Sequence, residues 1–179
     1  MVSYPAAEPL ANSFKDDAKS AISICKFPPF GKRSLTAMIP QFSYQSIPAD
    51  QLMKQLDESG SSVFLMIETR EGLENVDEIA ALVGFDAILV GSNDLSLALG
   101  VLGQWDSGVF RDALRKIGDA AKRNGKFMGL AGLYTRPDIC TWAVKELNVR
   151  YILGNLDVGL LSSAMAQNVK GLKAFSKAE

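Results

Sequence analysis

Histidine is absent from the 179 residues of this chain. Without an imidazole, these residues cannot form the Ser-His-Asp or Cys-His arrangements of nucleophilic catalysis, and they cannot build the usual zinc site based on histidine. Any acid–base or metal chemistry of the chain must therefore use carboxylates, lysine, tyrosine or water.

Cysteine, net charge and long apolar runs are also scarce. Cys25 and Cys140 are isolated in apolar helical contexts, so we expect small buried thiols in a reducing compartment, the cytoplasm, rather than a disulfide or a metal pair. A formal net charge of -1 provides no basic surface, so we expect no nucleic-acid partner. The longest apolar runs are far shorter than the roughly 20 residues that span a bilayer, and no signal-peptide pattern is present, so we expect no membrane partner.

Four short apolar runs alternate with helical patterns, which is typical of an α/β protein with a parallel sheet. The runs lie at residues 63–67, 87–90, 127–130 and 151–153, and their near-continuous apolar character predicts strands that are covered on both faces. Apolar spacing predicts helices near residues 16–25, 50–59, 73–83, 113–123, 135–147 and 158–175, the fifth with Thr135 as its N-cap. No strand is expected before residue 60.

Four β/α units are half of a (β/α)8 barrel, which needs about 250 residues when complete. We therefore expect one partial domain over residues 1–179, in which parallel β/α units form the second half of a TIM-like barrel and the N-terminal strands are missing. The alternative is an open, doubly wound sheet of four strands, because the sequence pattern does not distinguish it from half a barrel.

Two acidic residues follow consecutive strands of this predicted sheet. Glu68 comes directly after the first apolar run, and Asp94 follows the second in the segment G-S-N-D-L-S. Strands joined by one helix are usually neighbours about 4.8 Å apart, so both carboxylates can reach one point at the carboxyl edge of the sheet. Such a pair suits Mg²⁺ or Mn²⁺. The structural alternative is that Glu68 pairs with Arg70 or Arg33 and that Asp94 caps a helix starting at Leu95.

The same residues carry a family resemblance. Residues 67–80, with a glutamate followed by N-x-x-x-I-A, and residues 84–96, ending in N-D-L-S, resemble the signature of the HpcH/HpaI aldolases. The segment P-P-x-G-x-R-S at residues 28–34 and the segment G-x-x-D-x-x-x-L at residues 154–161 are similar to two further family segments. The resemblance covers about residues 14–175 and identifies the chain as a member of this family of metal-dependent pyruvate aldolases with barrel folds.

The resemblance implies a function and roles for individual residues. Glu68 and Asp94 would hold a divalent ion, Mg²⁺ or Mn²⁺ with Co²⁺ and Zn²⁺ as alternatives, and the backbone N–H groups of Asn93 and Asp94 would receive the carboxylate of pyruvate. The reaction implied is the reversible, retro-aldol cleavage of a 4-hydroxy-2-oxo acid to pyruvate and an aldehyde. The family's glycine-proline pair reads Gly91-Ser92 here.

The first residues align with the end of the family's fourth strand, so the catalytic histidine and the substrate-binding arginine are missing, and we identify no catalytic residue. We therefore keep two alternatives to an active lyase: a truncated, inactive member that serves as a partner or is a remnant, and a lyase of the citrate-lyase β-subunit or malyl-CoA type. Because half a barrel leaves open sheet edges and apolar surface, we expect a homo-oligomer.

Overall fold

A sheet of four parallel strands forms the centre of the computed structural model, which describes residues 13–175. The strands are β1 (Phe64–Ile67), β2 (Ala87–Gly91), β3 (Phe127–Ala131) and β4 (Val149–Ile152), and they lie side by side in chain order. In the register Ile67 stands opposite Val90, and Gly91 stands opposite Ala131. The apolar runs therefore predicted the strands to within two residues, and the α/β class with parallel strands is confirmed.

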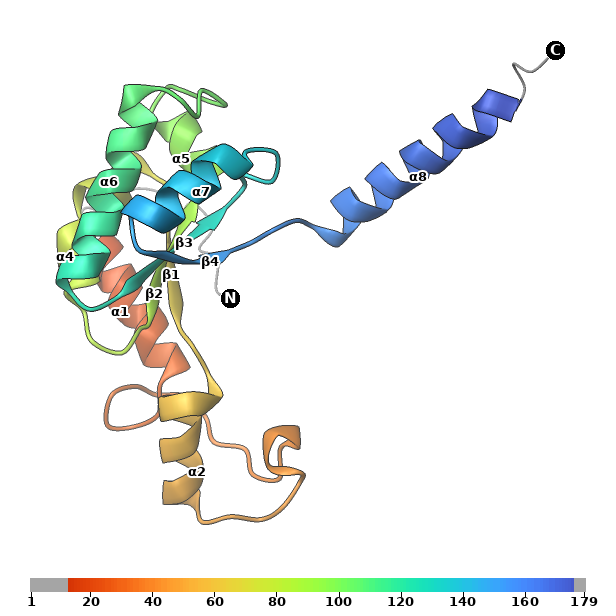
Figure 1. Cartoon of the computed structure of the whole chain (residues 1–179). Helices are drawn as coiled ribbons and strands as arrows, with labels where there is room; N and C mark the ends of the chain where they lie inside the picture. Colours follow the sequence, from red (N-terminus) through yellow and green to blue (C-terminus); the bar gives the residue numbers. More distant parts are fainter. Residues whose placement is uncertain (1–12, 176–179) are drawn as a thin grey trace.

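Helices connect the strands (Figure 1). The connections after β1, β2 and β3 contain α3 (Arg70–Glu74) with α4 (Val76–Ala80), α5 (Ser92–Ala98) with α6 (Gly108–Arg123), and α7 (Pro137–Glu146). The last helix, α8 (Asp157–Phe175), follows β4. Upstream of the sheet lie α1 (Ser13–Cys25), the 3-10 helix η1 (Pro40–Phe42), α2 (Ala49–Gln55) and the π-helical turn η2 (Leu56–Gly60). No strand occurs between residues 13 and 63, as expected.

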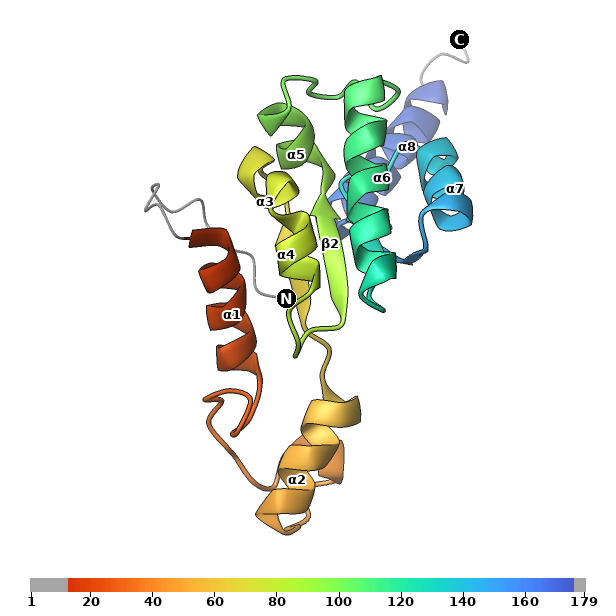
Figure 2. The same cartoon turned by 90° about the vertical axis from the view of Figure 1, so that its left-hand side faces the viewer.

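One face of the sheet packs against the helices and forms the main core. Helix α6 contributes Phe110, Leu114 and Ile117, whose side chains are fully buried, and Ile88 and Met128 of the sheet are also fully buried in this cluster. Each such side chain stabilises the fold by about 1.5–3 kcal/mol through removal from water. Figure 2 shows α4 and α6 running along the strands, with α1 outside α4. This layer holds β1, β2 and β3 in place beneath the site.

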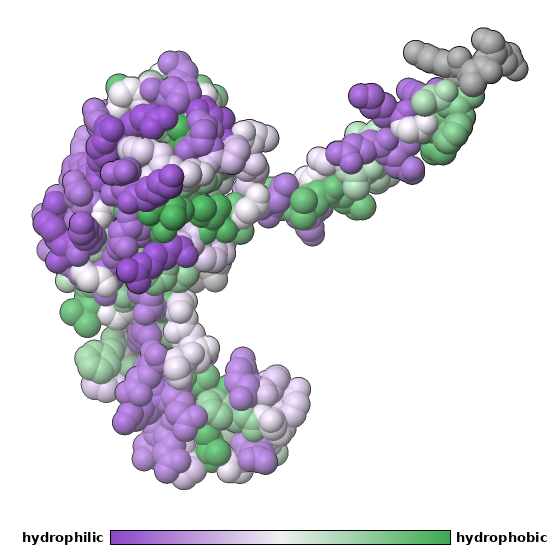
Figure 3. Space-filling model, in the orientation of Figure 1, coloured by the Kyte–Doolittle hydropathy of each residue, from purple (hydrophilic) through white to green (hydrophobic). Residues whose placement is uncertain are grey.

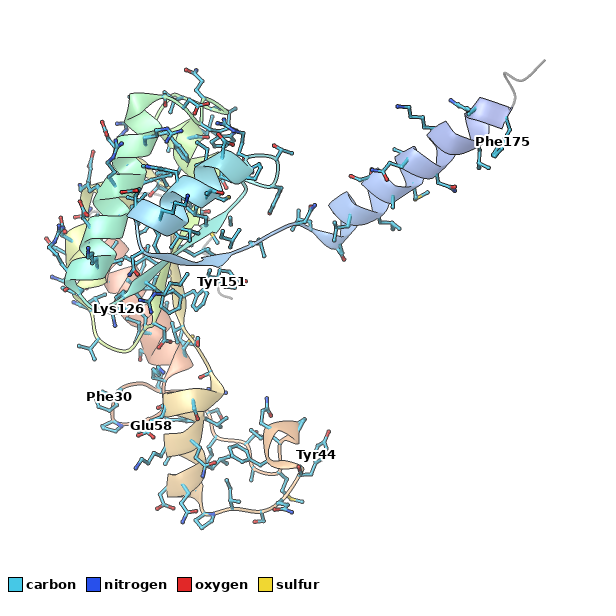
Figure 4. The ribbon with its side chains drawn as sticks, in the orientation of Figure 1. Phe30, Tyr44, Glu58, Lys126, Tyr151 and Phe175 are labelled. Carbon is cyan, nitrogen blue, oxygen red and sulfur yellow. The ribbon has the colours of Figure 1, made fainter. Side chains whose placement is uncertain are left out.

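The other face of the sheet carries half-buried aromatic side chains. The ring of Phe64 contacts the rings of Phe127 and Tyr151 edge-on, at centroid distances of 5.8 and 5.2 Å. Tyr151 is labelled on β4 in Figure 4. The prediction of strands covered on both faces is therefore wrong for β1, whose residues alternate between buried and accessible, and for β4, in which Val149 alone is buried. Among the described residues, nothing packs over this face to the extent that the helices cover the other one.

Residues 26–62 form a small lobe at the amino-terminal end of the sheet (Figure 1). Phe27, Leu52 and Leu56 make a second, separate cluster of buried side chains there. Lys26 is buried and donates a hydrogen bond to the backbone carbonyl of Asp57 at 3.0 Å, and Asp57 accepts one from the backbone N–H of Phe27. The lobe lies at the end of the strands opposite to the site described below.

Helix α8 projects away from the rest of the chain (Figure 1). None of its 19 residues is buried, and Figure 3 shows apolar surface along it. Leu161 is 63% exposed, and Phe175, labelled at the far end in Figure 4, is 81% exposed. Among the described helices, none is long and apolar enough to cross a membrane.

Two local predictions are corrected by the structure. The helix expected over residues 73–83 is divided at Asn75, whose ψ of 9° departs from helical geometry and whose side-chain amide donates to the Glu71 carbonyl. Thr135 is not the N-cap of α7: Arg136 occupies that position, and its guanidinium instead pairs with Asp138 in the first turn. The early proline of this helix, Pro137, stands where it was expected.

Candidate metal and pyruvate site

Glu68 and Asp94 lie at the carboxyl edge of neighbouring strands, as predicted. β1 and β2 are paired in parallel with Ile67 opposite Val90, so the residues that follow, Glu68 and Gly91, are also neighbours. Asp94 stands three residues further on, in the first turn of α5. The fold therefore brings the two carboxylates to the same end of the same strand pair.

The turn after Glu68 is fixed by the next residue. Thr69 is the N-cap of α3, and its hydroxyl oxygen accepts a hydrogen bond from the backbone N–H of Gly72 at 3.0 Å. Such a cap contributes about 1 kcal/mol to a helix start. We did not single out Thr69 in the sequence, although a threonine just before a helical pattern is an ordinary N-cap signal. Its cap holds the backbone where Glu68 leaves the strand.

The Glu68 side chain leans over the end of β2. A Cβ atom built on Gly91 would stand 2.8 Å from Oε2 of Glu68, so the carboxylate lies directly beside the Gly91 backbone. Burial, followed by the negative charge of Asp94, raises the pKa of Glu68 above its ordinary value of 4.5. The negative charge of Asp94 therefore reaches the Glu68 carboxyl group across the strand ends.

Glu68 forms no hydrogen bond or ion pair with any residue in the described range 13–175. The arginines that could have neutralised it are used elsewhere: Arg70 donates to the backbone carbonyl of Ala98 at 3.0 Å, and Arg33 lies over the ring of Phe27 at 4.7 Å. The alternative in which Glu68 pairs with Arg70 or Arg33 is therefore wrong. A partly desolvated carboxylate without a protein cation is a suitable ligand for a metal cation.

Asp94 and Asn93 belong to the first turn of α5, which begins at Ser92 rather than at Leu95. Both side chains are exposed, and the N-cap position, Gly91, has no side chain to cap the helix. Asp94 makes no capping hydrogen bond among the described residues, so its interpretation as a simple helix cap is wrong. The N–H groups of a first helical turn have no acceptor within the helix, which leaves those of Asn93 and Asp94 able to bind an anion.

The donor set fits a hard divalent ion in an open site. Within residues 13–175, no group of three or more histidine, cysteine or acidic side chains could enclose a metal. Two carboxylates alone leave positions for water and substrate oxygens, which is how Mg²⁺ is commonly bound, whereas a structural zinc site is closed by four protein ligands. The residues present are therefore consistent with an ion that is shared between protein and substrate.

Ser92, which the sequence analysis identified as a departure from the family segment, also borders this site. Its side chain is fully buried at the start of α5, and its hydroxyl oxygen has no hydrogen-bond partner among the described residues. The family segment that this chain resembles has proline there. This chain therefore differs from the family segment at the first residue of α5, next to the site, and not at Glu68 or Asp94.

Comparison with known proteins shows the family. The model of the HpcH/HpaI aldolase/citrate lyase family matches residues 12–140. The chain is 36% identical over 162 residues to 4-hydroxy-4-methyl-2-oxoglutarate aldolase of Chaetomium globosum, covering 90% of this chain and 60% of that protein. It is 42% identical over 146 residues to the protein of the same name from Hapsidospora irregularis, covering 82% of this chain and 54% of that protein. The chain belongs to the HpcH/HpaI aldolase/citrate lyase family.

Solved structures share the fold of this chain. The HpcH/HpaI aldolase of Desulfitobacterium hafniense superimposes with a TM-score of 0.78 at 25% identity, covering 89% of this chain and 60% of that one. Macrophomate synthase shares the fold, with a TM-score of 0.71, and the match covers 90% of this chain and 56% of that one. The chain thus spans little more than half the length of the relatives that it matches, and its four strands correspond to part of their barrel.

Proposed function

We propose that this chain carries the metal- and pyruvate-binding part of a lyase that cleaves 4-hydroxy-2-oxo acids reversibly to pyruvate and an aldehyde. The observation that supports this most directly is the position of the Glu68 carboxylate, which is partly buried, lacks a protein partner among the described residues and leans toward the strand that leads to Asp94. Two relatives whose sequence match covers 90% and 82% of this chain are named as 4-hydroxy-4-methyl-2-oxoglutarate aldolases.

In this proposal each residue has a distinct role. Glu68 and Asp94 hold a divalent ion, Mg²⁺ or Mn²⁺, and the N–H groups of Asn93 and Asp94 bind the carboxylate of the 2-oxo acid. The ion, when bound, supplies Lewis-acid stabilisation of the negative charge that develops on the keto oxygen. The protein residues bind and orient the 2-oxo acid so that its carboxylate meets the start of α5.

The proton-transfer group is not part of this proposal, because the 179 residues contain no histidine. A complete cleavage needs a group that protonates or deprotonates the hydroxyl oxygen of the substrate. The proposal for this chain alone is therefore limited to ion binding, pyruvate binding and metal-promoted enolisation of pyruvate, in which a base of the solvent or buffer accepts the proton of the methyl group. Enolisation is measurable without knowledge of the aldehyde.

Binding of Mn²⁺, followed by electron paramagnetic resonance, tests the ion site. We expect one ion per chain, and we expect Glu68→Ala and Asp94→Ala each to weaken binding by at least about 10-fold, since loss of outer-shell groups alone costs 10- to 100-fold. Glu74→Ala is the matched control, because Glu74 is an exposed carboxylate at the end of α3 that is not one of the proposed ligands. Equal affinity in all four proteins would contradict the site.

Exchange of the pyruvate methyl protons for deuterium, followed by NMR with Mg²⁺, tests the chemistry. Exchange that depends on the chain, on Mg²⁺ and on Glu68 supports a lyase. Ion binding without any exchange would favour the alternative of a non-catalytic family member that keeps its binding site. Neither outcome depends on the identity of the aldehyde.

We also infer that copies of the chain associate through α8. This helix exposes an apolar side, with Met165 at 60% and Leu161 at 63% exposure, while the aromatic face of the sheet is also accessible on the same chain. Two apolar surfaces on one chain can cover each other between copies. Light scattering should show a mass above 19.3 kDa that decreases with Leu161→Glu, whereas Val83→Glu, at a residue 79% exposed outside α8, should not change it. A monomeric unmutated chain would contradict this inference.

The cytoplasm remains the proposed compartment. Cys25 and Cys140 are both free and half-buried. Burial, together with the nearby Asp138 charge, raises the pKa of the Cys140 thiol, which keeps it protonated and poorly reactive. The Cys140 thiol should therefore persist in the reduced protein.

A further inference from the structure

Gly91 ends β2 beside Glu68, and its backbone does not require a glycine. Its φ of -81° and ψ of 85° lie on the negative-φ side that L-residues adopt readily. Other glycines of the chain differ in this respect: Gly132, after β3, has a φ of 88°, which L side chains rarely adopt. The reason for a glycine at position 91 must therefore be sought in its surroundings.

The space around Gly91 is filled by Glu68. A Cβ atom at this position would stand 2.8 Å from Glu68 Oε2, 2.9 Å from Glu68 Cβ and 3.2 Å from Met66 Sδ. The carboxylate oxygen and the methionine sulphur are ends of flexible side chains. The Cβ atom of Glu68 is not, because it follows the backbone at the end of β1. Alanine at position 91 would thus have to displace Glu68 itself.

A glycine at a strand end is not crowded in general. Gly154 follows β4 as Gly91 ends β2, and a Cβ atom built there has no neighbour within 4 Å. Gly132 is crowded by Asn93, whose side-chain nitrogen would be 3.1 Å from the added atom. Of these three glycines at strand ends, the two crowded ones lie beside Glu68 and Asn93, which are proposed to bind the ion and the 2-oxo acid.

We propose that Gly91 is a positioning residue, whose missing side chain allows the Glu68 carboxylate to lie across the end of β2 on the way to Asp94. This inference rests on the proposed function and extends it to a residue that contacts neither ion nor substrate. A side chain at position 91 turns Glu68 away from the strand end. The two carboxylates then no longer face one ion together.

The test compares Gly91→Ala with the matched control Gly154→Ala. We expect Gly91→Ala to weaken Mn²⁺ binding by about 10-fold or more, in the range seen when groups that orient a metal ligand are lost. Gly154→Ala should bind Mn²⁺ within about twofold of the unmutated chain, because its methyl group enters open space. Far-UV circular dichroism and thermal unfolding of the same samples separate loss of the site from loss of the fold.

A second variant covers the case in which Gly91→Ala does not fold. Met66→Ala removes the sulphur neighbour and frees volume on the half-buried face of β1, but leaves the overlap with Glu68. Gly91→Ala in the Met66→Ala background should therefore fold and still lose Mn²⁺ affinity relative to Met66→Ala alone. Unchanged affinity in either comparison overturns the role of Gly91 while the ion site stands. Failure of the unmutated chain to bind Mn²⁺ overturns the ion site and this role together.

Discussion

Asp86 offers a sharp test of how the sheet beneath the site is held together. It precedes β2, and its carboxylate accepts a hydrogen bond from the backbone N–H of Val63 at 2.7 Å, while its own N–H donates to the Val63 carbonyl at 2.9 Å. These two bonds fasten the start of β1 to β2. Val63 is only 7% exposed, so its N–H has no easy access to water if the carboxylate is removed.

The magnitude follows from the type of bond. A hydrogen bond to a charged acceptor contributes about 1.5–3 kcal/mol, and a neutral one about 0.5–1.5 kcal/mol. Asp86→Ala should therefore lower the free energy of unfolding by about 2 kcal/mol, and Asp86→Asn, which keeps an acceptor oxygen, by about 1 kcal/mol. For a chain of this size, 2 kcal/mol corresponds to a decrease in Tm of about 4–8 °C.

Thermal and urea unfolding, followed by circular dichroism, measure both variants against the unmutated chain. The order of stability should be Asp, then Asn, then Ala at position 86. A change in Tm of less than about 1 °C for Asp86→Ala would refute the reasoning, since it would mean that the Val63 N–H finds another partner or that the bond contributes nothing.

Two further predictions concern the core and the site. Ile117→Ala should destabilise the chain by about 3 kcal/mol in urea unfolding, because Ile117 is fully buried and its truncation leaves a cavity between α6 and the sheet. Val109→Ala is the control on the same helix: its side chain is 52% exposed, so stability should change by less than about 0.5 kcal/mol. Equal effects of the two substitutions would contradict the position of the core. Glu68→Gln should make the ion-free chain more stable at neutral pH, by less than about 1 kcal/mol because the carboxylate is only partly buried and solvent screens its charge. The direction of this stability change follows from the raised pKa of Glu68, because the folded chain binds the carboxyl proton more tightly than the unfolded chain does. The unmutated chain therefore loses stability as pH rises from about 4.5 through the folded pKa. The Glu68→Gln variant has no such proton and does not lose this stability. Parallel pH dependences of the two proteins would contradict it.

The strands and the strand-end carboxylates could be predicted from the sequence because each depends on a short, local pattern. Apolar runs of three to five residues predict strands, and the residue after each run lies at the carboxyl edge whatever the details of the helices. To predict that Glu68 and Asp94 lie at the same edge, it was enough to assume that consecutive strands are neighbours in the sheet. The observed strand order confirms that assumption. Their roles as ion ligands remain a prediction.

The features that the sequence did not reveal depend on register or on contacts across the fold. The close approach of Glu68 to Gly91 follows from the pairing of Ile67 with Val90, which no local pattern determines. The break at Asn75 lies within an apolar spacing that is otherwise continuous, at a residue whose side-chain amide donates to the Glu71 carbonyl in addition to its backbone N–H. The sequence predicted the apolar side of α8, but an apolar side does not specify which surface the helix packs against.

The detachment of α8 has a consequence for how this chain can be observed in solution. A helix of 19 residues that buries none of its side chains draws its order from local propensity alone, and such helices are marginal in water. Its backbone amides should exchange with deuterated solvent far faster than those of β2 and β3, whose protection reflects the packed core. Slow exchange in α8 that sets in as protein concentration rises would then report directly on another molecule covering it, residue by residue.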